Sequence, residues 1–291
     1  MSILGHEKEK NIFQTILRSN RLHHAYIFSG RTGSGKKLFA RELARSIICE
    51  EDSFLETCMC KHCIVATGSQ HPDIHLVEET PVKIEVARQI SAEAYLSPLS
   101  AKRKVYIIDN AHTFTKEAAN AILKTLEEPS SDTHFFLITD RYEQILPTIR
   151  SRCINIRFSS LISSEVQEIL TGLGVEDDLL PIIADQASGS VSYAQFLLDN
   201  MDETGRFSPD KSKLELYSEI NNLDTKEKIR AYCSSMYAYM LEKYKNSGDE
   251  TLLDFSNYLL EILKRLEYNV SLDMFRLDLY IKTIEVLCEK S

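Results

Sequence analysis

Residues 29–37 nearly match a phosphate-binding loop. They match the pattern G-x-x-x-x-G-K-[ST] at every position except the last. The candidate nucleotide-binding residues in this loop are Gly30, Gly33, Gly35 and Lys36. Glycines let backbone N–H groups turn inward around phosphate, and the lysine supplies a positive charge. The final Ser or Thr would place its hydroxyl on Mg²⁺ beside the terminal phosphates. Lys37 stands there instead, so the loop is suited to hold a nucleotide but not to hydrolyse one.

A second motif agrees with this interpretation. The apolar strand pattern 104–108 ends in Asp109, an arrangement typical of the carboxylate that organises a catalytic metal. ATPases of the AAA+ class place a Glu directly after this Asp to polarise the attacking water, but here the residue is Asn110, which cannot take a proton. A chance glycine loop beside an ordinary strand is disfavoured, because both motifs fall in order. Lys36 keeps two equal interpretations: residual binding of ATP or ADP, and a solvated lysine at a helix start.

Four of the seven cysteines are crowded into one stretch of the chain: Cys49, Cys58, Cys60 and Cys63. Four thiolates suit a tetrahedral structural Zn²⁺ site that is closed to water. The two-residue spacing between Cys60 and Cys63 is common in such sites, whereas the one-residue spacing between Cys58 and Cys60 is tighter than usual. His62 could replace a cysteine that does not reach the ion. A disulfide is the main alternative. The lack of a secretion signal at the N-terminus favours metal.

Composition places the chain among globular proteins. It has 291 residues, enough for two or three compact units, with 43% hydrophobic and 26% charged residues. The net charge of −9 argues against a protein that grips nucleic acid by bulk positive charge. No apolar run has the length of a membrane span, so we expect a cytoplasmic protein without membrane contact.

Hydrophobic periodicity divides the chain into an α/β part and a helical part. Strands are predicted at residues 25–28, 74–77, 104–108, 134–139 and 153–158, alternating with helices at 7–19, from 36 onward, at 86–95 and at 115–127. This alternation indicates a parallel sheet covered by helices on both faces. From Ser163 onward only helical spacing remains, and a polar stretch at 199–213 suggests a boundary. Two apolar stripes beyond it, within 229–244 and 252–266, are expected to be core.

Several long motifs resemble the clamp-loader AAA+ proteins of bacterial replication. They are the strand motif 104–112, the segment Asn120–Pro129, and Leu146–Cys153, which carries the Ser-Arg-Cys signature of that family. The resemblance covers about residues 1–200 in order. It implies an AAA+ α/β core of P-loop NTPase type over residues 1–160 with a zinc-binding insertion at 49–63. A helical lid at 161–205 and an all-α collar domain at 206–291, which joins a hetero-oligomeric ring, would follow.

Two kinds of member share these motifs: motor subunits, called gamma or tau, which hydrolyse ATP, and delta-prime subunits, which do not. A motor needs a hydroxyl at position 37, an acid at 110 and an arginine in the lid, where this chain has Ser192. The three departures favour the second kind, a subunit of the DNA polymerase III holoenzyme without intrinsic ATPase activity. Gly30, Gly33, Gly35, Lys36 and Asp109 would then form only a residual nucleotide site.

The resemblance also implies one intact functional residue and a set of partners. Arg152, in the Ser-Arg-Cys signature, would act as an arginine finger in trans at the ATP site of a neighbouring subunit, whereas Arg150 would be solvated. The implied partners are the gamma/tau and delta subunits, with the sliding clamp and primed DNA reached through the assembled complex. Two alternatives stay open: an ATP-hydrolysing motor subunit, and a nucleotide-sensing AAA+ adaptor outside replication.

Overall fold

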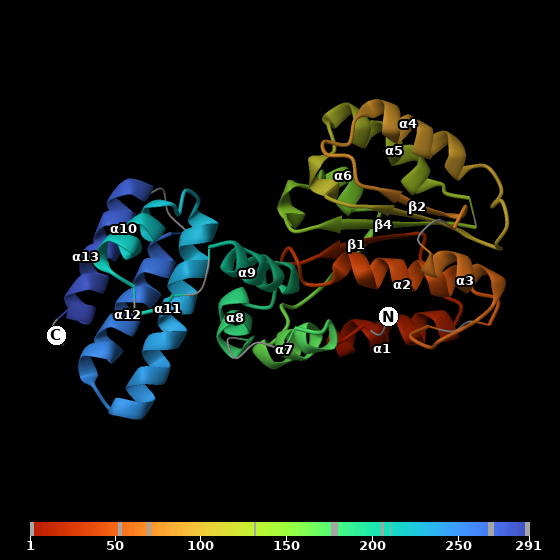
Figure 1. Cartoon of the computed structure of the whole chain (residues 1–291). Coiled ribbons are helices and arrows are strands. Elements are labelled where there is room, and N and C mark those ends of the chain that lie inside the picture. Colours follow the sequence, from red (N-terminus) through yellow and green to blue (C-terminus); the bar gives the residue numbers. More distant parts are fainter. Residues whose placement is uncertain are drawn as a thin grey trace. The chain divides into compact units, whose positions relative to one another are not determined.

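The computed structural model describes residues 3–51, 54–68, 71–130, 132–175, 180–204, 207–209, 211–266 and 271–288. The chain forms two compact units, Met1–Leu161 and Ile162–Ser291, which are described separately below (Figure 1). Residues 52 and 53 of the predicted insertion, and the predicted boundary at 205/206, lie outside the described residues.

The first unit is built on a five-stranded parallel sheet in the order β2-β3-β4-β1-β5. Its strands are β1 (Ala25–Ser29), β2 (Ile74–Val77), β3 (Lys104–Ile108), β4 (Thr133–Thr139) and β5 (Ile154–Arg157). These bounds confirm the predicted strands to within one residue at each end. Because the strands are parallel, their carboxyl ends share one edge of the sheet, where ligands bind in open α/β folds. The segments that follow β1, β3 and β4 therefore meet at that edge.

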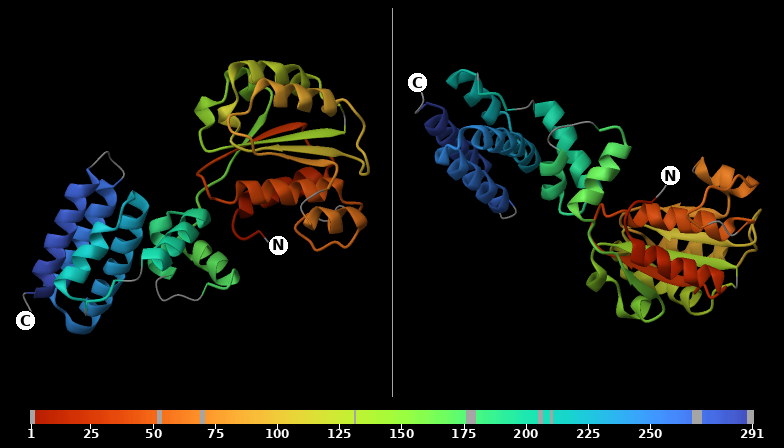
Figure 2. Two further views of the ribbon diagram at one scale, coloured as in Figure 1. Left: turned by 45° about the horizontal axis from the view of Figure 1, so that its top comes forward. Right: turned by 90° about the horizontal axis from the view of Figure 1, so that it is seen from below.

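Helices cover both faces of the sheet (Figures 1 and 2). On one face lie α1 (Glu7–Arg18) and α2 (Lys36–Ile48), and on the other α4 (Ile84–Ala94) and α5 (Lys116–Glu127). The alternation of β1 explains both contacts, since Tyr26 and Phe28 point to the first pair while Ala25 and Ile27 point to the second. The predicted N-cap of α5 is confirmed: the Thr115 hydroxyl accepts a hydrogen bond from the Ala118 amide at 3.1 Å.

Three aromatic rings stack across the β2, β3 and β4 strands. His75 lies opposite Tyr106, and Tyr106 lies opposite Phe135, in the register of the sheet. The ring centroids are 4.6 Å and 5.3 Å apart, and the planes are inclined by only 15° and 14°. These cross-strand contacts hold the four-residue edge strand β2 on the sheet.

Four short elements of the first unit were not predicted: α3 (Lys61–Thr67), α6 (Pro147–Arg150), and the 3₁₀ turns η1 (Ala111–Thr113) and η2 (Tyr142–Gln144). Each spans fewer than eight residues, so hydrophobic periodicity has too few positions to reveal it. Two of them nevertheless matter for the site, since α3 carries one of the candidate metal-binding cysteines and α6 leads into the Ser-Arg-Cys signature.

The second unit is entirely helical in its described residues. It consists of α7 (Ser163–Gly172), α8 (Leu180–Ala187), α9 (Val191–Thr204), α10 (Lys213–Asn221), α11 (Lys226–Ser247), α12 (Glu250–Arg265) and α13 (Leu272–Cys288). Both predicted stripes are confirmed as core, with Ile229, Met236 and Leu259 fully buried. The predicted boundary stretch is partly helical, because α9 continues to Thr204. None of the helices that the structure describes is both long and apolar enough to cross a membrane.

A buried carboxylate fastens the segment between α4 and β3. Asp73, fully buried before β2, accepts backbone hydrogen bonds from Leu99 at 2.6 Å, Ser100 at 2.8 Å and Ala101 at 2.7 Å. Burial opposes ionisation, but the three amides outweigh it and lower the pKa of Asp73.

We expect Asp73→Ala to lower the free energy of unfolding by about 3 kcal/mol, because three amides lose a charged acceptor. Since its pKa is depressed, the wild-type carboxylate contributes stability above the unfolded pKa of about 3.9, and that contribution is lost as the pH falls through the lower folded value. Urea denaturation at several pH values measures both effects. The exposed Glu79→Ala is the control and should change stability by less than about 0.5 kcal/mol; equal losses in both variants would contradict the assignment.

Candidate functional site

The predicted phosphate-binding loop connects β1 to α2 at the carboxyl edge of the sheet. Gly30, Gly33 and Gly35 have φ values of 148°, 75° and 91°, a region that residues with a side chain rarely adopt. Gly30 has a second requirement, since a Cβ built on it would lie 2.5 Å from the carbonyl oxygen of Phe158. The glycines are therefore needed for the shape of the loop whether or not a nucleotide binds.

We expect Gly30→Ala to destabilise the first unit by about 2 kcal/mol or more, because the methyl group meets backbone at Phe158 while φ is positive. Gly172→Ala is the matched control, since a Cβ there has no neighbour within 4 Å and the residue ends a helix. Thermal unfolding of both variants measures the difference. A Gly30→Ala protein as stable as Gly172→Ala would show that the loop adopts another conformation.

Lys36 is buried, so the interpretation of a solvated lysine is wrong. It is only 5% exposed, and its Nζ donates to the carbonyl oxygens of Gly30 at 2.8 Å and Arg31 at 2.5 Å. Burial lowers the pKa of Lys36 to about 8, although Asp140 and Asp109 oppose this. The ammonium group thus lies inside the loop, where an incoming phosphate would have to compete with two carbonyl oxygens.

Lys37 is paired with the acidic residue of the second motif. Its Nζ lies 3.1 Å from Asp109 Oδ2 and also contacts Glu78 Oε1. Partial burial lowers its pKa, but hydrogen bonds and charge attraction from Glu78 and Asp109 outweigh this, so the pKa of Lys37 is raised. The structure therefore brings Asp109 to the loop, as the motifs imply, but a lysine side chain already contacts its carboxylate.

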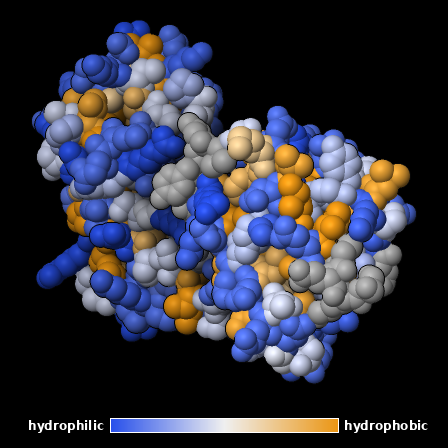
Figure 3. Space-filling model, turned by 90° about the vertical axis from the view of Figure 1, so that its left-hand side faces the viewer, coloured by the Kyte–Doolittle hydropathy of each residue, from blue (hydrophilic) through white to orange (hydrophobic). Residues whose placement is uncertain are grey.

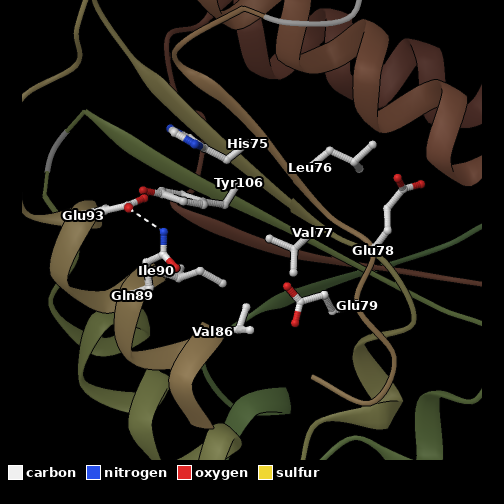
Figure 4. Close-up of a pocket in the computed structure, with 10 residues that line it drawn as sticks. All are labelled: His75, Leu76, Val77, Glu78, Glu79, Val86, Gln89, Ile90, Glu93 and Tyr106. Carbon is white, nitrogen blue, oxygen red and sulfur yellow. Dashed lines mark hydrogen bonds between the residues drawn. The ribbon is translucent and has the colours of Figure 1, made fainter. Parts of the chain in front are cut away.

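A pocket of about 590 Å³ lies beside this region, between β2 and α4 (Figure 4). Glu93 and Gln89 of α4 are joined by a hydrogen bond of 2.9 Å at one end of the pocket. Figure 4 shows Glu78 and Glu79 at the other end, with Glu78 directed away from Glu79. That orientation is the one in which Glu78 reaches Lys37.

Two further contacts fix the loop. The Thr32 hydroxyl donates to Asp140 Oδ2 at 2.9 Å, which ties the loop to the residue that follows β4. On the other side, the buried His6 ring places Nε2 2.6 Å from the carbonyl oxygen of Ser34. His6 was not predicted as part of the site. Nothing in its local pattern reveals the contact, because the two residues are 28 positions apart.

The structure brings the four predicted metal-binding cysteines together. Their Sγ atoms all lie within 4.8 Å of one another, and Cys49 Sγ is 3.6 Å from Cys58 Sγ and 3.9 Å from Cys60 Sγ. Four sulfurs at about 2.3 Å from a central Zn²⁺ would be about 3.8 Å apart, so the set fits such an ion. None of the four forms a disulfide, and the separations exceed the S–S bond of about 2.05 Å, which rules against the disulfide alternative in this conformation. The cluster could hold a metal ion.

Local backbone geometry explains why the tight spacing is tolerated. The amide of Cys60 donates to Cys58 Sγ at 3.4 Å, so the chain turns back on itself between the two residues. Cys60 is also the N-cap of α3, which places Cys63 in the first turn of that helix. Arg45 of α2 donates from Nη1 to Cys63 Sγ at 2.9 Å. Burial and the contacts with Cys49 and Cys60 raise the pKa of Cys63, and the Arg45 guanidinium only partly offsets this. Metal binding would therefore have to displace the proton of this thiol.

His62 does not replace a cysteine. Its Nδ1 lies 3.0 Å from Nε2 of His71, whose Nδ1 accepts a hydrogen bond from the Asp73 amide at 3.1 Å. Both rings are buried, at 5% and 4% exposure. This chain of contacts attaches α3 to the segment that precedes β2, and so fixes the position of the cysteine cluster on the sheet.

Arg152 lies at the amino-terminal end of the strands, whereas the loop lies at their carboxyl-terminal end. The strand β5 runs from Ile154, level with Tyr26, to Arg157, level with Ser29; the loop follows Ser29, whereas Arg152 precedes Ile154. At about 3.3 Å per residue, the length of β5 alone separates the two by about 10 Å. The structure therefore does not bring Arg152 to the nucleotide loop of its own chain.

The Arg152 side chain is partly exposed and held by local partners. Nη1 donates to the carbonyl oxygen of Thr148 at 2.7 Å, and Nη2 pairs with Glu127 at the end of α5. Arg150, which was expected to be solvated, instead pairs with Glu143 at 2.5 Å and lies over the Tyr142 ring at 5.2 Å. In the second unit, Ser192 is exposed near the start of α9.

The sheet order, the glycine loop after β1 and the carboxylate after β3 define a P-loop protein of the AAA+ class. A family model described as "DNA polymerase III, delta subunit" matches residues 5–162. The chain belongs to this family, and it is a clamp-loader-type AAA+ protein.

Two relatives matched by sequence agree with this assignment. The chain is 28% identical over 263 residues to DNA polymerase III subunit gamma of Buchnera aphidicola, covering 85% of this chain and 70% of that protein. It is 36% identical over 170 residues to DNA polymerase III subunit delta' of Bacillus subtilis, covering 58% of this chain and half of that protein. Among solved structures, a gamma subunit-related protein of Thermotoga maritima is similar with a TM-score of 0.44 and 17% identity, covering 94% of this chain and 99% of that one.

Proposed function

We propose that this chain is a delta-prime-type subunit of a clamp loader, a non-hydrolysing AAA+ protein that supplies Arg152 to the ATP site of a neighbouring subunit. The observation that carries the proposal is the pairing of Lys37 with Asp109. It occupies the carboxylate that a motor subunit needs for its metal, and Asn110 cannot serve as the base. A chain with this site has lost hydrolysis but has kept the fold that such a ring requires.

The position of Arg152 supports a role in trans. It lies at the opposite end of the strands from its own loop, so its guanidinium does not face its own nucleotide, and 30% of its side chain is exposed. A planar, permanently charged group placed against a γ-phosphate neutralises the charge that develops in phosphoryl transfer. In the assembled ring, Arg152 would exchange its contact with Glu127 for that phosphate.

The cysteine cluster has a structural role in this proposal. Cys49, Cys58, Cys60 and Cys63 would hold one Zn²⁺ with no open coordination position, so the ion supplies folding energy and no catalysis. The four side chains come from the end of α2, the following loop and the start of α3. They would therefore hold together the segment that also places Phe54 in the core beside Phe39.

Residues 161–205 are proposed to form the lid, and residues 206–291 of the second unit are proposed to join the collar of the ring. On α13, Met274, Leu277 and Ile281 are exposed at helical spacing, and Leu214 on the neighbouring α10 is 78% exposed. The side of the molecule in Figure 3 is largely hydrophilic, with hydrophobic residues scattered among the hydrophilic ones. The partners would be gamma/tau and delta subunits, with the sliding clamp and primed DNA bound by the whole assembly.

A second candidate is an ATP-hydrolysing gamma-type subunit. The similarity to the Buchnera gamma subunit extends over 85% of this chain, further than the similarity to the Bacillus delta' subunit. An AAA+ adaptor outside replication has no observation of its own in its favour.

ATP turnover distinguishes the candidates. The chain alone should be inactive, and it should raise turnover when it is added to gamma/tau and delta subunits with clamp and primed DNA. Mg²⁺-dependent turnover by the chain alone would establish the motor alternative. Failure to join or stimulate the complex would favour the adaptor.

A further inference from the structure

Lys37 lies where three elements converge at the carboxyl edge of the sheet. It is the second residue of α2, while Asp109 directly follows β3 and Glu78 directly follows β2. Its Nζ contacts both carboxylates, at 3.1 Å from Asp109 Oδ2. The side chains of Lys37 and Asp109 are only 37% and 20% exposed, so the pair is shielded more than an ordinary surface ion pair.

The residues present do not fit Mg²⁺. A P-loop magnesium site uses a Ser or Thr hydroxyl at the position of Lys37 and the carboxylate at the position of Asp109, with near-octahedral oxygen ligands at about 2.0–2.1 Å. A protonated amine has no lone pair to offer a metal. It also places a positive charge within hydrogen-bond distance of the oxygen that would be a ligand. A divalent ion could enter only if the lysine left both carboxylates.

We propose that the Lys37 ammonium group is a built-in substitute for the divalent cation, so that the loop binds the terminal phosphates of a nucleoside di- or triphosphate without Mg²⁺. The loop keeps its three glycines, and two adjacent lysines provide positive charge on either side of it. Lys36 lies on the inner face of the loop, where a phosphate would compete with the carbonyl oxygens of Gly30 and Arg31 for its ammonium group. Lys37 lies on the face toward β2 and β3.

Charge explains why such a site would bind without turning over. Lys37 neutralises part of the charge of Asp109 and Glu78, which would otherwise repel phosphate when no metal is present. An ammonium group can donate hydrogen bonds to phosphate oxygens, but it does not ligate an attacking water and lower its pKa, as a divalent ion does. The nucleotide would act as a stable occupant of the fold. This inference concerns the chain's own loop and is independent of the role proposed for Arg152.

Binding of ADP to the full-length chain tests the proposal. Isothermal titration should be performed in buffer freed of divalent ions by a resin, and then with added MgCl₂; a soluble chelator is avoided because it could strip metal from the cysteine cluster. We expect the wild-type Kd to change by less than about twofold between the two buffers. Lys37→Thr restores the hydroxyl, and its affinity should become at least about tenfold tighter with Mg²⁺ than without it, a difference of about 1.4 kcal/mol.

The control is Lys116→Thr, which removes an exposed lysine at the start of α5 and should behave as wild type. A wild-type affinity that falls about tenfold when Mg²⁺ is removed would overturn the proposal, and so would a wild-type chain that binds no ADP in either buffer. If Lys37→Thr does not fold, Mn²⁺ serves as a probe on the wild type: electron paramagnetic resonance should detect no Mn²⁺ bound with ADP, and stoichiometric Mn²⁺ would refute the substitution.

Discussion

Replacing Arg152 with alanine should slow ATP hydrolysis at the neighbouring subunit's site by about 10³–10⁵-fold, the range found for arginine fingers. The guanidinium would stabilise charge that develops on the transferred phosphoryl group, and alanine offers no substitute. Rapid-quench measurement of a single turnover is the suitable assay, in the complex with clamp and primed DNA. The steady-state rate of the whole assembly would fall less, because its other ATP sites do not depend on this chain.

Two variants separate a finger from a structural arginine. Arg150→Ala removes a cation two residues away that pairs with Glu143, and it should leave the rate within about twofold of wild type. Arg152→Lys keeps the charge but loses the planar fork, so its rate should be intermediate. If Arg152→Ala hydrolyses ATP as fast as Arg150→Ala in an intact complex, the proposed role in trans is wrong.

Removing a sulfur from the cysteine cluster should abolish metal binding. Purified wild type is expected to contain about one zinc ion per chain, and Cys60→Ser far less, because structural zinc sites need all four ligands. Since metal binding and local folding are coupled, residues 54–68 should lose protection in hydrogen exchange. Zinc content by mass spectrometry and exchange of that segment are the two readouts. The core of the sheet should stay protected, as its contacts do not involve the cluster.

Cys153→Ser provides the matched control. Cys153 lies outside the cluster, and burial raises its pKa to about 12, so it remains an unreactive thiol. Its serine variant should keep the zinc and the exchange pattern of the wild type. Wild-type protein without zinc, or equal zinc loss in the two variants, would refute the metal site.

Much of the first unit could be predicted from sequence because its signals are local. Each strand is a short apolar run closed by a polar residue, and Thr115 is followed by a helix with regular apolar spacing. The four cysteines were recognised for the same reason, since ligand type and spacing are visible in one stretch. The loop glycines were likewise recognised from a sequence motif.

What could not be predicted depends on contacts between distant parts of the chain. The sequence shows that Lys37 replaces a hydroxyl, but its pairing with Glu78, 41 residues away, depends on the packing of α2 against the sheet beside β3. The burial of Lys36 and the contact of His6 with Ser34 are of the same kind. The position of Arg152 at the far end of the strands from the loop likewise could not be predicted without the strand register.

The three stacked rings on β2, β3 and β4 determine which carboxylate faces Lys37. A strand of four residues at the rim of a sheet is weakly held by its backbone, and a slip of one position would exchange its two faces. Glu79 would then take the position of Glu78, and its side chain would point to the opposite face of the sheet from the one to which it now points. The ring of His75 opposes such a slip, because it would have to leave Tyr106. The aromatic stack thus fixes the strand register that places the Glu78 carboxylate against Lys37.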